Sequence, residues 1–391
     1  MSGENGKEII YFDNNATTRV APPVFEEMVP YLTEHYGNPS SAYGFGRRVK
    51  DAVERARDQV AGLLGCESKQ VIFTSCGTES DNAAILSALQ LTGQRHVVTS
   101  AVEHSAIKNQ CDHLERLGYA ITHVPVSSEG LIDPDEVVKA IRPETALVTL
   151  MWANNETGVL FPVEEIARLC AEKNVLFHTD AVQAVGKIPI HLKESYIDFL
   201  SLSGHKLHAP KGVGVLFARK RAKVLPHVIG GGQEKGKRGG TENVASIVGL
   251  GKAAELASEH LEQERLKVKQ LRDRFETTIL EKIPGTRLNG HREQRLPNTT
   301  NISFDDVEGE ALLLALDRRG ICASAGSACT TGSVEPSHVL RAMGVEHRQA
   351  LSSLRFSFSI YNTEKEADIV LPFLCQTVED LRLSAPCKPA A

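Results

Sequence analysis

The sequence predicts an α/β fold in which a mostly parallel sheet carries helices on both faces. Along residues 71–180, short apolar runs that are typical of strands alternate with stretches whose apolar residues recur at helical spacing. Such alternation favours a parallel sheet with helices packed on both sides. Polar clusters follow several of the predicted strands, and in such a sheet ligands bind beyond the carboxyl ends of the strands.

The predicted elements follow one another in a regular order. After a strand-like opening at 9–12, a helix is predicted over 49–64 and ends at Gly65. The further predicted strands cover residues 71–73, 96–99, 121–126, 146–152, 175–178, 199–202 and 215–217. The further predicted helices cover a segment that ends near residue 89, and residues 105–117, 134–141 and 163–173. Asp133 fits an N-cap for the helix that begins at Pro134.

The pattern changes after the glycine-rich stretch 230–243. Residues 243–282 predict a long helical connector, which is first apolar and then strongly charged from Glu259 onward. The rest of the chain predicts a second, smaller domain, with a strand at 301–304, a helix at 308–318, a glycine- and serine-rich loop, a helix at 336–343 and a strand at 354–359.

Composition and charge exclude several classes of partner. The hydrophobic content of 41% and the charged content of 24% are those of an ordinary soluble protein. The net charge of −5 gives no reason to expect a nucleic acid or an anionic membrane surface as a partner. Residues 1–8 lack the apolar core of a signal peptide, and no apolar run is long enough to span a bilayer, so we expect a cytoplasmic protein. The eight cysteines form no Cys-x-x-Cys pair, which argues against a zinc site and a disulfide framework.

Three motifs point to one kind of chemistry. Lys206 ends the motif Ser-Gly-His-Lys between two short apolar runs, so we expect it on a tight turn between strands, where its amine can condense with an aldehyde. Cys76 to Ser80 joins a strand to a helix, where backbone amides can bind a phosphate. Asp180 follows another strand, and a carboxylate there can keep a pyridine nitrogen protonated. Each motif alone has a simpler interpretation: Lys206 as a surface lysine, Cys76 to Ser80 as a helix cap, and Asp180 as a helix N-cap. Together they are what a pyridoxal phosphate enzyme requires.

The chain resembles the cysteine desulfurases of the NifS/IscS group, within the class V aminotransferase family. The matching stretches run in order from Tyr11 to about residue 365 and include YFDNNATT, YGNPSS, FTSCGTESDN, ANNETG, HTDAVQAVGK, SLSGHKLHAPKGVG, RGGTENV, SAGSACTTGSVEPSHVLRAMG and LRFS. The resemblance implies fold type I, with a large domain that carries a seven-stranded, mostly parallel sheet and a smaller α+β C-terminal domain. We place the large domain at 15–260 and the small domain at 1–14 and 261–391.

The resemblance also implies a role for individual residues toward pyridoxal 5'-phosphate and the substrate. Lys206 would form the Schiff base, Gly77, Thr78, Ser203 and His205 would bind the phosphate, Asp180 the ring nitrogen, Gln183 the phenolic oxygen, and His104 the ring face. His104 could also move protons, although without the resemblance it is better interpreted as a packed core histidine. Asn155 and Arg355 would hold the substrate carboxylate, because a guanidinium offers a bidentate grip. Thr241 would reach the phosphate bound by the other subunit of a homodimer with shared active sites.

Cys329 is the expected nucleophile. It lies in residues 323–333, which consist only of Ala, Ser, Gly, Cys and Thr, so we expect a mobile, exposed loop. A mobile carrier suits a thiol that attacks sulfur in one pocket and passes it to another protein. Cys322, beside Ile321, is expected in the core, and Cys76 is expected to be a small filler near the cofactor.

The predicted function is a cysteine desulfurase that converts L-cysteine to L-alanine and leaves a persulfide on Cys329. The sulfur would pass to an iron–sulfur scaffold protein or another acceptor. We expect no metal of the enzyme's own, although Cys329 could ligate an iron–sulfur cluster during transfer. The alternatives are a selenocysteine lyase, which can proceed without the loop thiol, an aminotransferase of the same fold, in which Cys329 is idle, and a non-catalytic sulfur carrier, which the Asp180–Lys206 pair disfavours.

Overall fold

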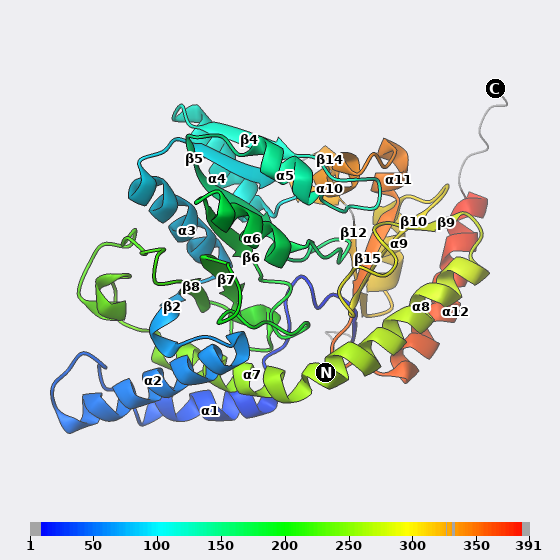
Figure 1. Cartoon of the computed structure of the whole chain (residues 1–391). Helices are drawn as coiled ribbons and strands as arrows, with labels where there is room; N and C mark the ends of the chain where they lie inside the picture. Colours follow the sequence, from blue (N-terminus) through cyan, green and yellow to red (C-terminus); the bar gives the residue numbers. More distant parts are fainter. Residues whose placement is uncertain (1–8, 326, 331–332, 385–391) are drawn as a thin grey trace.

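The structure is a computed structural model that describes residues 9–325, 327–330 and 333–384, without the side chains of 327–330 and 333–334 (Figure 1). Its central feature is a seven-stranded sheet. In spatial order the strands are β2 (Val71–Thr74), β8 (Gly214–Ala218), β7 (Phe199–Ser203), β6 (Leu176–Asp180), β5 (Thr145–Met151), β3 (His96–Ser100) and β4 (Ala120–Val124). β8 runs opposite to the other six strands, which are parallel to one another. The predicted mostly parallel sheet is therefore confirmed.

Helices cover both faces of this sheet. The helices of this part are α1 (Pro22–Thr33), α2 (Gly44–Leu64), α3 (Gly77–Thr92), α4 (Ser105–Arg116), α5 (Pro134–Ala140), α6 (Val163–Glu172) and α7 (Val244–Gln263). Neighbouring strand residues point to opposite faces. Val98 of β3 accordingly packs in one core with Ile166 of α6 and Leu250 of α7. The adjacent Val97 packs in another core with Ile107 of α4.

A second group of elements surrounds a smaller, antiparallel sheet. Its strands in spatial order are β12 (Ser324–Ala325), β15 (Ser353–Ser357), β10 (Thr299–Phe304) and β9 (Thr286–Leu288). The helices beside it are α8 (Lys269–Lys282), α9 (Gly309–Asp317) and α12 (Glu364–Ser384). The core of this part contains Phe275, whose ring centroid lies 5.5 Å from that of Phe12 and 5.0 Å from that of Phe356.

The remaining elements are short. They are β1 (Ile10–Tyr11) and its parallel partner β11 (Ile321–Cys322), the antiparallel pair β13 (Ser327–Thr330) and β14 (Ser333–Pro336), α10 (His338–Ala342), α11 (His347–Leu351), and the 3₁₀ turns η1 (Ser68–Gln70), η2 (Gly204–Lys206) and η3 (Gln233–Gly236). The prediction of a loop over 323–333 is therefore wrong for the residues that form β12, β13 and the start of β14. Strands pair through their backbones and need no large side chains, so the composition of this segment did not reveal the strands.

The predicted helical connector is confirmed as α7, the π-helical turn η4 (Glu264–Val268) and α8, which follow one another without a break (Figure 1). Leu250 of α7 packs in the core of the large sheet and Phe275 of α8 in the core of the small sheet. The connector therefore joins the two cores, and the domain boundary near residue 260 stays a prediction.

Three helices have no counterpart among the predicted elements: α1, α11 and α12. The two longer ones each contain a proline within their length, Pro30 in α1 and Pro372 in α12. Proline removes a backbone donor and obscures a helical pattern, but in α12 burial of Val370, Leu374 and Val378 stabilises the helix.

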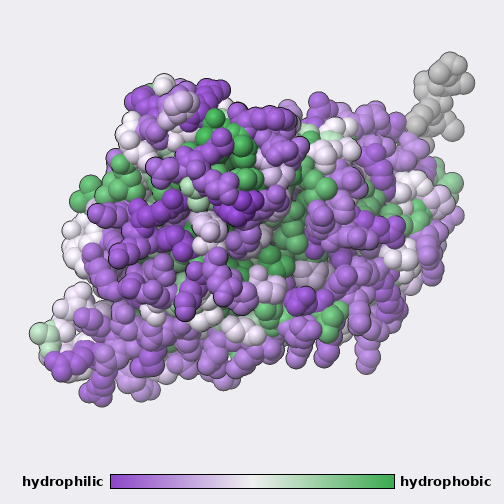
Figure 2. All heavy atoms as spheres, viewed as in Figure 1, coloured by the Kyte–Doolittle hydropathy of each residue, from purple (hydrophilic) through white to green (hydrophobic). Residues whose placement is uncertain are grey.

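The surface seen in Figure 2 is mainly hydrophilic. Within residues 9–384, as far as they are described, no helix is both long and apolar enough to cross a membrane.

Candidate active site

Most of the predicted site residues line one cavity of about 340 Å³. They are Gly77, Thr78, His104, Asn155, Asp180, Gln183, Ser203, His205, Lys206 and Arg355. The cavity lies where β5, β6 and β7 end, at Met151, Asp180 and Ser203. These are the carboxyl ends of parallel strands, where the sequence pattern predicted the site.

The start of α3 forms one wall of this cavity. Gly77 and Thr78 are the first residues of the helix, so their backbone amides have no intrahelical partner and can bind an anion. A side chain at Gly77 would bring its Cβ within 2.7 Å of Val182. Glycine is therefore required where the helix start approaches the segment after Asp180.

Asp180 ends β6 as a buried carboxylate. One of its oxygens accepts a hydrogen bond from the backbone amide of Val182 at 2.9 Å. Burial raises the pKa of Asp180, and the nearby His104 and Lys206 oppose this rise. A positively charged ligand group in the cavity would stabilise the ionised form further, because opposite charges attract strongly in a site with little water.

Lys206 lies in η2, the turn that joins the antiparallel strands β7 and β8, as predicted. Its ammonium donates to the backbone carbonyls of Asn15, at 2.5 Å, and Ala16, at 2.8 Å. Burial, followed by the charges of Arg355 and Lys187, lowers the pKa of Lys206 to about 7. The amine can therefore change its protonation state near neutral pH, as a nucleophile or a general base requires.

Gln183 is held by the same backbone carbonyl as Lys206. Its side-chain nitrogen donates to the carbonyl oxygen of Asn15 at 3.0 Å. Its side-chain oxygen is buried and has no hydrogen-bond partner among the described residues. This side of the amide is thus free to accept a hydrogen bond from a ligand.

Arg355 enters the cavity from β15 of the small sheet. Its guanidinium donates to Asp13 at 2.7 Å, to the hydroxyl of Ser324 at 2.9 Å and to the backbone carbonyl of Asn155 at 2.9 Å. Its Nε atom is buried without a partner in the described part of the chain. Arg355 is therefore oriented toward Asn155 and retains a donor.

The two histidines of the cavity differ. His104 caps α4 by accepting from the amide of Ala106 and is exposed, so the interpretation as a packed core residue is wrong. His205 contacts the hydroxyl of Thr17 at 3.1 Å. Burial and the neighbouring Lys206 lower the pKa of His205 to about 4, so its ring is neutral at physiological pH.

One predicted site residue, Thr241, does not line this cavity. It lines a different cavity of about 260 Å³, together with Arg238 and Glu242. Cys329 lies on β13 opposite Val334, and its side chain is outside the described part of the structure. Cys322 is half-buried on β11 rather than fully in the core, and Cys76 lines the active-site cavity as the N-cap of α3.

Three contributors to the site were not predicted: Asp13, Asn15 and Asp81. Asp13 and Asn15 belong to the motif YFDNNATT, but nothing local in this motif indicates a contact with Arg355 or Lys206. Asp81 lines the cavity from α3, and burial together with the charge of Asp180 raises its pKa. A carboxylate inside a helix that is otherwise rich in small residues could have been noticed.

Comparisons with known proteins show the family of the chain. The sequence profile of the family described as aminotransferase class-V matches residues 10–370. A cysteine desulfurase of Nostoc sp. is 54% identical over 381 residues, which is 97% of this chain and 95% of that protein. The cysteine desulfurase NifS of Azotobacter vinelandii is 51% identical over 379 residues, 96% of this chain and 94% of that protein.

Solved structures show the same architecture. A NifS-like protein matches with a TM-score of 0.89 and 39% sequence identity. The match covers 96% of this chain and 100% of the NifS-like protein. SspA, solved in complex with cysteine, has a TM-score of 0.80 and 36% identity, covering 90% of this chain and 100% of its own. Family profile, relatives and structures agree over nearly the whole length, and the chain belongs to the class-V aminotransferase family and, within it, to the cysteine desulfurase group.

Proposed function

We propose that the chain is a pyridoxal phosphate-dependent cysteine desulfurase, which converts L-cysteine to L-alanine and leaves a persulfide on Cys329. The observation that carries the proposal is one cavity that holds a lysine of lowered pKa, a buried Asp180 and Arg355. Relatives with this name that match nearly the full chain support the same reaction.

The residues of the cavity fit pyridoxal phosphate. The amides at the start of α3 and the hydroxyls of Thr78 and Ser203 suit a phosphate. The unpartnered oxygen of Gln183 suits a phenolic hydroxyl. The remaining groups suit the other parts of the molecule: Asp180 the ring nitrogen, Lys206 the aldehyde, and His104 the ring face.

When bound, pyridoxal phosphate supplies an electron sink for the bonds at the substrate Cα. Asp180 would hold a proton at the ring nitrogen, which keeps that sink strong. Lys206 would carry the cofactor and move the Cα proton, because its pKa of about 7 lets the amine accept and release protons near neutral pH. Arg355 and Asn155 would hold the substrate carboxylate and so present Cα to Lys206.

The sulfur leaves through Cys329. Its thiolate would attack the substrate sulfur, so that a sulfur–sulfur bond forms and the carbon–sulfur bond breaks. The electron pair of the broken bond stays with the substrate carbon, which takes up a proton to give alanine. The enzyme is left with a persulfide, whose outer sulfur passes to an acceptor.

The partners of the chain belong to the same proposal. They are L-cysteine, a second copy of the chain that contributes Thr241 to a shared site, and a sulfur acceptor, for which an iron–sulfur scaffold protein is the first candidate. The cytoplasmic location stays a prediction.

The attachment of the cofactor tests the proposal directly. The purified protein should be yellow, and borohydride reduction should fix the cofactor to Lys206, because this amine lines the cavity. Lys211, in the same glycine-rich turn, is the internal control for accessible lysines. Peptide mass spectrometry that finds the adduct on Lys211 would contradict the assignment. The same preparation should release alanine and sulfide in equal amounts from L-cysteine in the presence of a reductant.

A further inference from the structure

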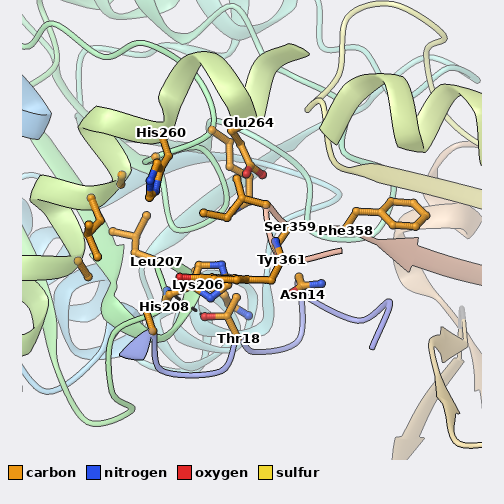
Figure 3. Close-up of a pocket in the computed structure, with 17 residues that line it drawn as sticks. Asn14, Thr18, Lys206, Leu207, His208, His260, Glu264, Phe358, Ser359 and Tyr361 are labelled. Atoms are coloured by element: carbon orange, nitrogen blue, oxygen red, sulfur yellow. Dashed lines mark hydrogen bonds between the residues drawn. The ribbon is translucent and has the colours of Figure 1, made fainter. Parts of the chain in front are cut away.

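A second, smaller cavity lies at the junction of the two cores, beside Lys206 (Figure 3). Its volume is about 50 Å³, and it is lined by residues from four parts of the chain. The N-terminal segment contributes Asn14 and Thr18, the large core Lys187, Lys206 and His208, the connector His260 and Glu264, and the segment after β15 Phe358 and Tyr361. Lys206 lines both this cavity and the active-site cavity.

Two opposite charges are buried at this junction. Lys187 is 6% exposed and Glu264 is 8% exposed. Burial lowers the pKa of Lys187 to about 8 and raises that of Glu264 to about 7, and each charge opposes the shift of the other. Burying two charges costs several kcal/mol unless they are compensated. A pair of apolar residues would fill this space at a smaller cost, so the pair calls for an explanation beyond packing.

A chain of hydrogen bonds leads from Lys187 to Lys206. The Lys187 ammonium donates to the backbone carbonyl of Gln183 at 3.1 Å. The side-chain nitrogen of Gln183 donates to the carbonyl of Asn15 at 3.0 Å. The Lys206 ammonium donates to the same carbonyl oxygen. The position of Gln183 thus affects the acceptor that orients the Lys206 amine.

Glu264 stands where the connector changes its geometry. It is the first residue of η4, the π-helical turn between α7 and α8. Single π turns within helices occur frequently at functional sites. Because α7 packs on the large core and α8 on the small core, Glu264 marks the joint between them, and it lines the same cavity as Lys187.

We propose that Lys187 and Glu264 are positioning residues, which tie the connector between the two cores to Lys206 through Gln183 and Asn15. For the reaction concerned, this inference rests on the proposed function. Neither residue lines the active-site cavity, so both act through other residues and not on the substrate.

The charge of Lys187 shifts the pKa of Lys206 in a known direction. The positive charges of Arg355 and Lys187 lower the pKa of Lys206, and the negative charges of Asp180 and Asp13 raise it. His205 also interacts electrostatically with Lys206, and Glu264, His208 and His260 line the same cavity as Lys187. Replacing Lys187 by a neutral residue removes one of the two lowering charges. The titration at Lys206 should therefore move to higher pH.

The test uses the cofactor-loaded enzyme and two measurements. The first is the midpoint of the pH titration of the visible absorbance of the bound cofactor, and the second is the pair of constants kcat and KM for L-cysteine. In Lys187→Met we expect the midpoint to rise by about half a pH unit or more. We expect kcat to fall about tenfold, because the reacting amine is misplaced, with KM within about twofold of the wild type. Lys187→Arg retains the charge and should restore the midpoint.

The connector supplies matched controls. Lys252 and Glu255 form an ion pair of 2.6 Å on α7 whose side chains are 29% and 40% exposed. Lys252→Met and Glu255→Gln should behave as the wild type, whereas Glu264→Gln should lower kcat and leave KM unchanged.

Several results would overturn the inference. One is a folded Lys187→Met variant whose midpoint and kcat equal those of the wild type, and another is a Lys187→Arg variant as impaired as Lys187→Met. If Lys187→Met does not fold, an unchanged kcat in Glu264→Gln decides against the proposal. If the wild-type enzyme makes no alanine from L-cysteine, the proposed function fails, but the titration midpoint still tests the inference.

Discussion

At the scale of single residues, the contacts of Arg355 support the substrate-binding role proposed for it. Its guanidinium is oriented by Asp13 and Ser324 and keeps a buried donor without a partner in the described part of the chain. A substrate carboxylate that enters the cavity can accept a hydrogen bond from this unpartnered donor. The geometry thus favours an anionic group beside Asn155.

Removing this guanidinium should weaken substrate binding more than cofactor binding. We expect Arg355→Ala to raise KM for L-cysteine at least about tenfold, since a charge-assisted hydrogen bond contributes about 1.5–3 kcal/mol. The absorbance of the bound cofactor should persist. Asp13→Asn is the control, because it removes the ion pair but retains the guanidinium. A KM in Arg355→Ala equal to that of the wild type would show that another residue holds the carboxylate.

The thiol of Cys329 should be needed only after the substrate has bound. We expect Cys329→Ala to retain the spectral change caused by L-cysteine but to form alanine and persulfide only at background level. Cys322→Ala is the matched control, because Cys322 is half-buried on β11 and burial raises its pKa, which keeps the thiol protonated. Normal alanine formation by Cys329→Ala would favour the lyase alternative, because an aminotransferase leaves the carbon–sulfur bond of L-cysteine intact.

At the scale of elements, the glycine-rich segment 230–243 is held by two ion pairs. Glu234 binds the guanidinium of Arg57 through two hydrogen bonds of 2.8 Å and accepts from the amide of Phe73. Arg238 pairs with Glu79 at 2.9 Å, in the first turn of α3. The first pair anchors the segment that carries Thr241 to α2, and the second anchors it to the start of α3.

The Arg57–Glu234 pair should contribute strongly to stability, because both side chains are at most 5% exposed. We expect Glu234→Ala to lower the free energy of unfolding by about 3–5 kcal/mol, since an unpaired buried charge remains on Arg57. Chemical denaturation measures this change. The exposed Lys235, with a φ of 58°, is the control: Lys235→Gly should stabilise by about 1 kcal/mol, because glycine tolerates this backbone conformation. A loss below about 1 kcal/mol in Glu234→Ala would place the pair among ordinary surface ion pairs.

At the scale of the whole molecule, the position of Thr241 outside the active-site cavity of its own chain is compatible with a role in a partner's site. Mixing two inactive variants tests this role. A heterodimer of Lys206→Ala and Thr241→Glu chains has one site with both defects and one with none if Thr241 acts across the interface. We therefore expect mixing to restore part of the activity, as the carboxylate at 241 repels a phosphate only in one of the sites. No recovery, with heterodimers shown to form, would refute the shared site.

Apart from α1, the sequence by itself determined the order of strands and helices in the large core. It also determined the turn that carries Lys206 and the strand end that carries Asp180. These features are local, because the period of apolar residues and the position of glycines report the conformation of the segment in which they occur. The other cavity residues were predicted from the resemblance to the family, because the family's motifs occur in order along this chain.

Only the tertiary structure decided which distant groups meet. The carbonyl that accepts from the Lys206 ammonium belongs to Asn15, 191 positions away, and the carboxylate that pairs with Arg355 belongs to Asp13, 342 positions away. The pairing of β12 with β15, and the burial of Lys187 with Glu264, likewise depend on neighbours from other parts of the chain. No periodic pattern encodes such contacts, because they form only when packing of the two cores brings separate segments together.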